Sequence, residues 1–579
     1  MSKDDKSKLA EEKKSAQLEQ NNFSLELGQE LHQIQSIFSN AIDFTKNQDN
    51  PSLWPAWKIA AFVALSSSEE KWEIYPLLNR TQRDFFFHLY VWNGDNVNLE
   101  LFEEFLGNLT SLDDSSFIQE FIRSENFQLY LKTKYSIETF DQEEPNYPDH
   151  DEYFLSPDYS FIFVYDSGKE APNLARDKSL LQSFYNELGV EYGYQALLQM
   201  IGDSYSLFLE NRYDEKVKSD RDLGWVDYYE AIEVMALYRS ETQLKKKARE
   251  IALDFKSLIG PGQTVRENLS ETDESIALKY FYKTLVYYWV SKGILKQNQS
   301  LSTEQNRDIF LDSLTVVGLC IKIAIQFIEI NQNIKIPTLA KMNLFEFFKI
   351  GNSLIFLWKK NVQDNLKSFF ELGVKIDFLG IKFKEEYEHF YSLPEYKIND
   401  ETSLWSNFHF LEKHQLWQSE FIQLATALGS QYQVLVQDLR VRSELYENYD
   451  VSEITIEEIL LNSLVKFALV SWRQNDSKID QNENNKKMMS FGIWKEDFLM
   501  FIHKFPLANP SGELAIELIT NYLNDWKLPK TENWIKYFTE LLNYHLVGIN
   551  YSQLEDAEWQ HVGGVVLFKI KEGVENLPH

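Results

Sequence analysis

Hydrophobic residues recur every three or four positions through most of this chain of 579 residues. In residues 98–131, one face of a predicted helix carries Leu101, Phe102, Phe105, Leu106 and Leu109. This spacing is that of an amphipathic helix, and it returns in residues 180–210 and 274–288. Two runs, residues 160–165 and 562–568, have the apolar character of strands instead. We therefore expect a mainly α protein, built as a multi-helical array or as layered helical domains with a few short strands.

A turn followed by a helix is predicted at residues 221–235. Gly224 suits a tight turn, and Asp227 stands three residues before Glu230, which is the spacing of a capping box. The helix has apolar residues on more than one face, so we expect it to be buried between neighbours. We define the polar block as Arg221, Asp222, Asp227, Glu230 and Glu233. It is either a polar site beside a turn or the capped, solvated edge of a core helix, and capping favours the second interpretation.

Changes in composition divide the chain into five predicted segments, as its length also suggests. Residues 1–22 form a charged tail that we expect to be disordered, and residues 23–140 an N-terminal helical array. Two prolines and six acidic residues make residues 141–152 an acidic linker. Residues 153–300 are a central helical domain with a short strand or hairpin. Residues 301–579 are a C-terminal helical domain with a flexible, Asn-rich insertion near 473–487.

Charge narrows the classes of function. The chain has 58 Lys and Arg against 88 Asp and Glu, which gives a net charge of −30. Such a surface repels phosphate backbones and anionic lipids, so we expect no nucleic-acid partner and no membrane binding. Lys322 interrupts the long apolar run at residues 311–330, which favours a buried helix over a membrane span. The charged N-terminus does not have the pattern of a signal peptide, and we expect a cytoplasmic protein.

The single cysteine and several histidines of the chain do not have the sequence neighbours that a catalytic or metal-binding site requires. Cys320 is the one cysteine and sits in an apolar run, so we expect a buried thiol and no disulfide. His88 lies within a predicted aromatic helix, which favours a core or rim position over a catalytic one. Asp149, His150 and Asp151 are consecutive in the acidic linker, where ligands rarely converge on a metal.

Two Glu-x-x-His pairs provide a candidate metal site, namely Glu386 with His389 and Glu558 with His561. On helices, two such pairs with two further glutamates build a carboxylate-bridged di-metal centre. The second pair adjoins the predicted strand at residues 562–568, however, and short motifs arise by chance in an acidic chain. We therefore favour no metal and no other cofactor, and no catalytic residue is assigned.

Several stretches together resemble an uncharacterised bacterial family, that of domain of unknown function 6178. The stretches are residues 83–92 with the following Asn-Gly-Asp, 101–131 and above all 211–233, which contains Asp222-Leu223-Gly224 and Glu230-Ala231-Ile232-Glu233. Residues 344–358 and 379–391 fit more loosely. The resemblance covers most of the chain after the tail. It implies a largely helical, soluble protein and supplies no activity and no catalytic residue. The charged tail and the Asn-rich insertion depart from the family pattern.

Three functions remain open at this stage. Helical arrays expose grooves that suit partner helices, and no catalytic constellation emerges, so we favour a non-enzymatic scaffold whose partner is another protein. One alternative is an enzyme with an interdomain, possibly metal-dependent, site. The other is a small-molecule sensor with an aromatic pocket. The oligomeric state is left open.

Overall fold

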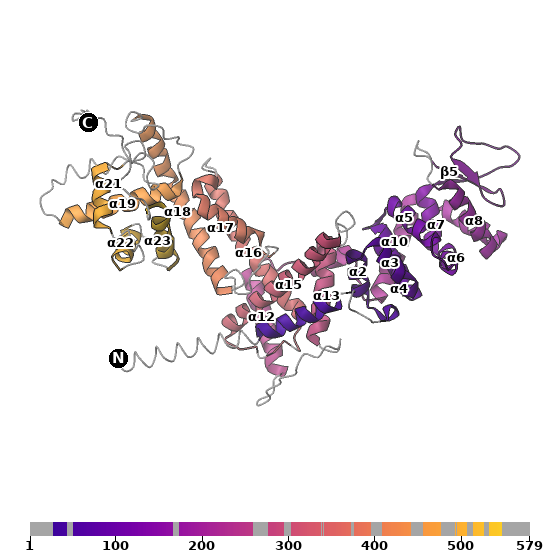
Figure 1. Cartoon of the computed structure of the whole chain (residues 1–579), viewed down its shortest axis with the longest axis horizontal. Coiled ribbons are helices and arrows are strands. Elements are labelled where there is room, and N and C mark those ends of the chain that lie inside the picture. Colours follow the sequence, from indigo (N-terminus) through magenta and orange to yellow (C-terminus); the bar gives the residue numbers. More distant parts are fainter. Residues whose placement is uncertain are drawn as a thin grey trace. The chain divides into compact units, whose positions relative to one another are not determined.

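The computed structural model describes residues 27–42, 44, 50–165, 173–258, 276–294, 303–336, 338–339, 341–371, 376–394, 408–441, 455–475, 493, 495–505, 513–525 and 532–546. Within these residues the protein is mainly α with a few short strands (Figure 1), which confirms the predicted fold class. The predicted tail at 1–22 and strand at 562–568 lie outside the described residues, as does the insertion beyond Asn475.

The chain divides into two compact units. Unit 1 comprises Met1–Tyr238, Arg249–Ile321 and Gln332–Ile350, and unit 2 comprises Arg239–Ala248, Lys322–Asn331 and Gly351–His579. Three long helices contribute residues to both units: α12 (Glu241–Leu258), α15 (Thr303–Gln332) and α16 (Leu344–Phe370).

Unit 1 begins with a helix at residues 27–41 and continues mainly with helices of 7 to 18 residues. Its labelled elements are η1 (Pro51–Leu53), α2 (Ala56–Leu65), α3 (Ser68–Ile74), η2 (Tyr75–Leu77), α4 (Arg80–Val91), β1 (Trp92–Asn93), β2 (Asn96–Val97), α5 (Leu99–Thr110), α6 (Ser116–Arg123), α7 (Glu125–Lys134), β3 (Ser136–Thr139), β4 (Tyr153–Leu155), β5 (Phe161–Val164), α8 (Leu174–Leu188), α9 (Val190–Gly202), α10 (Tyr205–Asp222), α11 (Tyr228–Val234) and α13 (Ile276–Lys292).

The predicted strand at residues 160–165 is β5, the central strand of an antiparallel sheet with the order β3-β5-β4. Phe163 pairs with Ile137 on one side and with Phe154 on the other. This pairing gives a different role to residues 141–152, which were predicted to link two domains. They join β3 to β4 within unit 1, because both strands hydrogen-bond to β5.

Two hydrophobic cores stabilise unit 1, and α4 contributes to both. Its Phe86, Phe87, Tyr90 and Val91 are buried in a core formed with α5 to α10. Its Phe85 belongs to a second core with Trp225 and Val226, in which α2 and α13 also take part. The helix is aromatic on several faces because it lies between these two cores. Its N-terminus is capped by Asn79, whose side chain accepts from the Gln82 amide at 3.0 Å.

The structure corrects the expectation that the helix after Asp227 is buried between neighbours. Helix α11 has only seven residues, and among them only Ala231 is buried. Tyr229 and Ile232 are 61% and 45% exposed, and they lie three residues apart on one side of the helix. The apolar side chains of Tyr229 and Ile232 are therefore a surface feature, whereas Val234 packs against the second core.

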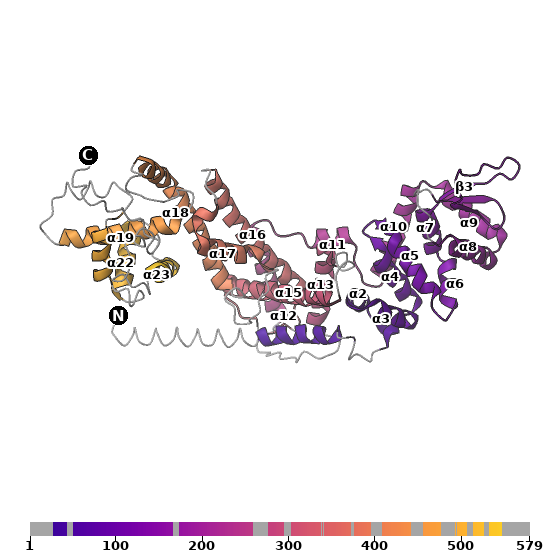
Figure 2. The ribbon, with the colours of Figure 1, turned by 45° about the horizontal axis from the view of Figure 1, so that its top comes forward.

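Helices make up almost all of the described part of unit 2. Its elements are η4 (Ile376–Leu379), α17 (Ile381–Ser392), α18 (Phe408–Val441), α19 (Ile456–Asn475), α21 (Lys495–Lys504), α22 (Glu513–Asp525) and α23 (Glu532–Leu546). Helices α19, α22 and α23 pack on one another (Figure 2). Aromatic residues of α18 and α23 fill the interior, where the Phe421 and Tyr537 ring centroids are 5.2 Å apart.

Helix α15 contains the apolar run at residues 311–330. By length and composition it is the one helix among the described residues that could cross a membrane, with a mean hydropathy of 1.8. In the structure, 72% of the 18-residue apolar window of this helix is buried inside the protein, as in the core helix of a soluble domain. Cys320 lies in this helix, and its side chain is buried as predicted.

Candidate functional site

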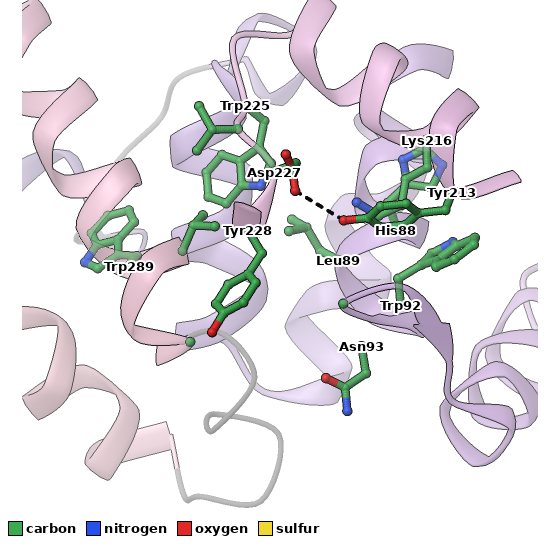
Figure 3. Close-up of a pocket in the computed structure, with 14 residues that line it drawn as sticks. His88, Leu89, Trp92, Asn93, Tyr213, Lys216, Trp225, Asp227, Tyr228 and Trp289 are labelled. Carbon is green, nitrogen blue, oxygen red and sulfur yellow. Dashed lines mark hydrogen bonds between the residues drawn. The ribbon is translucent and has the colours of Figure 1, made fainter. Parts of the chain in front are cut away.

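A pocket of about 100 Å³ opens on unit 1 where its two hydrophobic cores meet (Figure 3). Trp92 belongs to the first core and Tyr213 packs against it, whereas Trp225 and Val226 belong to the second. The described residues that line the pocket are His88, Leu89, Trp92, Asn93, Gly94, Tyr213, Lys216, Trp225, Val226, Asp227, Tyr228, Trp289, Val290 and Gly293.

Four pieces of backbone hold these residues in place. Helix α4 supplies His88, and the tight β1–β2 hairpin after it turns at Gly94, whose φ of 70° suits a residue without Cβ. Helix α10 supplies Tyr213 and Lys216 one turn apart on one face. The turn before α11 contains Gly224, with a φ of 82°, as the sequence predicts. The end of α13 closes the remaining side.

A buried carboxylate organises the polar side of the pocket. The Oδ1 atom of Asp220 lies 2.6 Å from His88 Nδ1, and its Oδ2 atom accepts from Lys216 Nζ at 2.7 Å. Asp220 and His88 are 3% and 8% exposed. Burial alone would raise the pKa of Asp220, but the charges and hydrogen bonds of His88 and Lys216 outweigh burial and lower this pKa. Asp220 is therefore a stable anion that orients the His88 ring and neutralises Lys216.

Asp227 forms the acidic wall of the pocket and also caps α11. Its carboxylate accepts from the amides of Tyr229 and Glu230, at 2.9 and 3.1 Å. It also accepts from the Tyr213 hydroxyl at 3.2 Å. Burial and then the Asp227 charge raise the pKa of Tyr213, so this hydroxyl stays protonated as a donor at neutral pH. The predicted N-cap is confirmed.

Of the five residues in the polar block, only Asp227 lines the pocket. Glu230 does not complete a capping box. Its carboxylate accepts from Arg221 Nη2 at 3.0 Å and from the Tyr287 hydroxyl at 3.2 Å, which ties α11 to α13. Burial and then the Glu230 charge raise the pKa of Tyr287 to about 12. Asp222 and Glu233 are exposed at the surface. A solvated surface edge therefore accounts for Arg221, Asp222, Glu230 and Glu233. Asp227 both caps α11 and lines the pocket.

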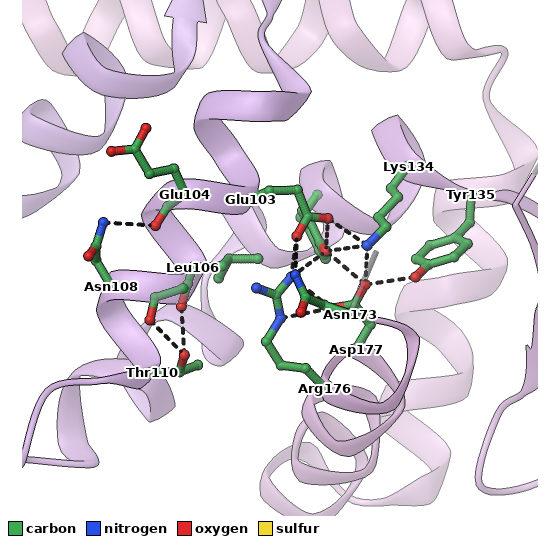
Figure 4. Close-up of polar contacts among 12 residues, drawn as sticks. Glu103, Glu104, Leu106, Asn108, Thr110, Lys134, Tyr135, Asn173, Arg176 and Asp177 are labelled. Carbon is green, nitrogen blue, oxygen red and sulfur yellow. Dashed lines mark hydrogen bonds and ion pairs between the residues drawn. The ribbon is translucent and has the colours of Figure 1, made fainter. Parts of the chain in front are cut away.

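A second polar cluster lies inside unit 1 and connects α5, α7 and α8 (Figure 4). Lys134 Nζ lies 2.5 Å from Glu103 Oε1 and 2.6 Å from Asp177 Oδ2. Arg176 pairs with the same two carboxylates, at 2.6 and 3.0 Å. The side chains of Lys134 and Asp177 are fully buried. Two cations and two anions thus balance one another in a mostly buried setting, which is typical of a structural network and not of a reactive site.

Hydrogen bonds complete this network. The hydroxyl of Tyr135 donates to Asp177 at 2.7 Å, and the hydroxyl of Tyr130 lies within hydrogen-bond distance of both Glu103 and Asp177. Burial and then the charge of Asp177 raise the pKa of both tyrosines. Burial would raise the pKa of Glu103, but Lys134, Tyr130 and Arg176 together lower it. Glu103 is therefore ionised and the two tyrosines are neutral at pH 7.

The candidate metal ligands of the sequence fall in unit 2. Glu386 and His389 lie one turn apart on α17, whereas Glu558 and His561 lie outside the described residues. Among the described residues, no group of three or more His, Cys, Asp or Glu has the geometry of a metal site. In unit 2, the Oε2 atom of the buried Glu457 is 3.9 Å from His545 Nε2. This pair comes from α19 and α23, and the sequence gives no spacing signal for it.

Comparisons with known proteins return no match to this chain among family models, curated proteins or solved structures. The resemblance to the family of domain of unknown function 6178 therefore stays a prediction. Two of its stretches do meet in space. Residues 83–95 and 211–233 supply all the lining residues of the pocket except Trp289, Val290 and Gly293.

Sequence reasoning missed most of the pocket. His88 was expected in the core or at its rim, and Asp220, Lys216 and Tyr213 were not singled out. A signal was present in part, since Lys216 and Asp220 have the i, i+4 spacing of a helical ion pair. The partner of this pair, His88, lies 132 positions away in the sequence, and no periodicity links the two helices.

Proposed function

We propose that this chain is a non-enzymatic protein-binding scaffold, and that the pocket on unit 1 receives one anchor side chain of the partner. The observation that carries the proposal is the combination of small volume and aromatic walls. Pockets for substrates or drug-sized ligands are about 300–1,000 Å³, several times larger than this one. A pocket of about 100 Å³ instead suits one side chain, and buried anchor side chains dominate protein–protein binding.

The surface beside the pocket supports the same proposal. The Tyr229 ring lies 5.6 Å from that of Tyr228, which lines the pocket. Tyr229 and Ile232 expose apolar surface on α11, the helix whose first residue, Tyr228, lines the pocket. A partner that fills the pocket can bury these side chains as well, which is the usual arrangement of an anchor and its surrounding contacts.

A substitution at the rim tests the proposal. Asn93 is exposed and lines the pocket, so Asn93→Trp places a large ring over the opening without entering a core. Asn96 is exposed on the same hairpin, pairs with Asn93 and does not line the pocket, which makes Asn96→Trp a matched control. We expect proteins captured from source-cell lysate by the parent chain and by Asn96→Trp to be lost with Asn93→Trp. Identical capture by all three chains would contradict the proposal.

The His88–Asp220 pair favours one second candidate, an enzyme in which His88 is a general base. A carboxylate at Nδ1 is the arrangement that orients a catalytic histidine. None of the described lining residues is Ser, Thr or Cys, so a mechanism of the Ser-His or Cys-His type has no nucleophile here. Hydrolysis of activated esters that is lost in His88→Gln, which keeps a polar partner for Asp220, would support this candidate. Equal rates in both chains would remove it.

Cytoplasmic residence, and the absence of nucleic-acid and membrane partners, belong to the same proposal. The support is the net charge of −30. Fractionation of source cells tests it, because recovery in the membrane pellet after a salt wash would refute a cytoplasmic scaffold.

A further inference from the structure

We propose that the group received by the pocket is a cation on an aliphatic chain, the end of a Lys or Arg side chain of a basic partner. This inference rests on the proposed function and adds the chemistry of the anchor. It follows from the charges of the lining residues, from the aromatic walls and from the charge of the whole chain.

The charges in the pocket leave one anion without a cation. Lys216 is neutralised by the buried carboxylate of Asp220, 2.7 Å away. Asp227 receives hydrogen bonds only from neutral donors, which are the Tyr213 hydroxyl and the first amides of α11. Among the described residues, no Lys or Arg forms an ion pair with Asp227. The amides offset part of its charge, but a half-buried carboxylate still favours a cation beside it.

The aromatic side chains add to this preference. Tyr213, Trp225 and Tyr228 come from three sides of the opening (Figure 3). The faces of such rings are negative and attract ammonium and guanidinium groups within about 6 Å. One ring of the pocket already makes this contact, since Lys216 Nζ lies 5.7 Å from the centre of Tyr213.

Size and long-range charge agree with a basic side chain. A volume of about 100 Å³ is enough for the end of a side chain and too little for a drug-sized ligand. The net charge of −30 attracts basic partners at long range. An acidic or neutral anchor side chain would leave the negative charge of Asp227 uncompensated.

Two small probes separate charge from shape. Saturation-transfer NMR on the full chain compares n-butylammonium with n-butanol, which has nearly the same shape and no charge. We expect n-butylammonium to bind more tightly than n-butanol, by about five-fold for a contact of about 1 kcal/mol. Asp227→Asn keeps a capping side chain at the start of α11 and removes the charge. In this variant we expect the advantage of n-butylammonium to disappear while n-butanol binding is unchanged.

The outcomes distinguish this inference from the proposed function. Equal affinities for the two probes, an undiminished advantage of n-butylammonium in Asp227→Asn, or no binding of either probe would overturn the cation inference. The capture experiment with Asn93→Trp judges docking independently. If the probes behave as expected and Asn93→Trp captures the same proteins as the parent chain, the pocket binds cations but does not dock the partner.

Discussion

At the scale of residues, the same charged side chains serve two different purposes in unit 1. In the cluster of Glu103, Lys134, Arg176 and Asp177, the charges cancel, and the side chains of Lys134 and Asp177 are fully buried. Beside the pocket, Asp220 is satisfied in a similar way, but Asp227 is half-exposed and pairs with no Lys or Arg in the part of the chain that the structure describes. Burial and partner count, and not residue type, therefore separate the structural carboxylates from the one available for recognition.

The first prediction concerns the buried cluster. Lys134→Met removes one cation and leaves Glu103 and Asp177 with less compensation in a buried setting. Removing one partner of such a network costs about 3–5 kcal/mol of unfolding free energy, because the remaining charge is buried unpaired. Urea denaturation followed by circular dichroism measures the loss. Arg80→Met removes a 73% exposed partner of Glu120 and should cost less than about 1 kcal/mol. Equal losses in the two variants would contradict the role of the cluster.

The second prediction concerns pH. Burial and then the charge of Lys536 lower the pKa of His414 to about 4. Between pH 6.5 and 4 the unfolded chain therefore binds a proton that the folded chain excludes, so stability falls as pH falls through this window and is fully present above it. The expected loss from pH 7 to pH 5 is about 2 kcal/mol.

Urea titrations at the two pH values test this, with His414→Phe as the comparison. The variant lacks the titrating ring, so its stability should change less between pH 7 and pH 5. A loss of the same size in the variant would assign the pH dependence to other groups.

At the scale of elements, short helices depend on their ends. Helix α11 has seven residues and one buried side chain, so its cap and its ties to neighbours hold it in place. The Asp227 carboxylate accepts hydrogen bonds from the first amides of the helix, and the Glu230 carboxylate accepts one from the Tyr287 hydroxyl of α13. An element with so little buried surface has low local stability, as is common for binding surfaces.

The third prediction follows from this cap. Asp227→Ala removes the acceptor for the amides of Tyr229 and Glu230 and should cost about 0.5–2 kcal/mol of local stability. Hydrogen exchange at these two amides should become faster. Asp227→Asn preserves the acceptor, and its exchange rates should stay close to those of the parent chain. Unchanged exchange in Asp227→Ala would show that the cap does not stabilise α11.

The fourth prediction concerns the start of α17. Gly380 has a φ of 90°, and a Cβ added to it would lie 2.4 Å from Cδ of the buried Glu457. Gly380→Ala should therefore destabilise unit 2 by more than about 1 kcal/mol, since backbone strain and a clash combine.

A glycine within a helix provides the matched control. Gly107 lies in α5, and its added Cβ would meet no atom within 4 Å. Gly107→Ala should be neutral or stabilise the fold by up to about 1 kcal/mol, because alanine loses less backbone entropy in a helix. Thermal unfolding compares the two, and equal destabilisation would contradict the steric argument.

At the scale of the whole molecule, charge sets the kind of partner. A net charge of −30 opposes approach to phosphate backbones and favours basic surfaces. The pocket agrees with this preference at short range through Asp227 and the rings around it. Long-range attraction and the proposed cationic anchor thus favour the same class of partner.

The fifth prediction tests this charge argument. In fluorescence anisotropy with a labelled DNA duplex, the full chain should show no binding at physiological ionic strength. The physical reason is that the chain has no excess of Lys and Arg to release counterions from the phosphates. Binding in which the logarithm of the affinity falls linearly with the logarithm of the salt concentration would contradict it.

The sequence by itself determined the helical class of this protein and several of its local features. Helical spacing of apolar residues, the strand at 160–165, the buried Cys320 and the Asp227 cap were readable, because each depends on neighbours within a few positions. The prediction for Glu230 was wrong. Its spacing from Asp227 predicts a capping box, but its carboxylate accepts hydrogen bonds from Arg221 and Tyr287.

Tertiary structure alone decided the pocket, the buried ion cluster and the exposure of α11. His88 meets Asp220 across 132 positions, and Lys134 meets Asp177 across 43. Such pairs are set by how two helices pack, and the period of a single helix carries no information about its partner. The apolar residues of α11 were readable as a pattern, but only packing decided that Tyr229 and Ile232 face solvent beside the pocket.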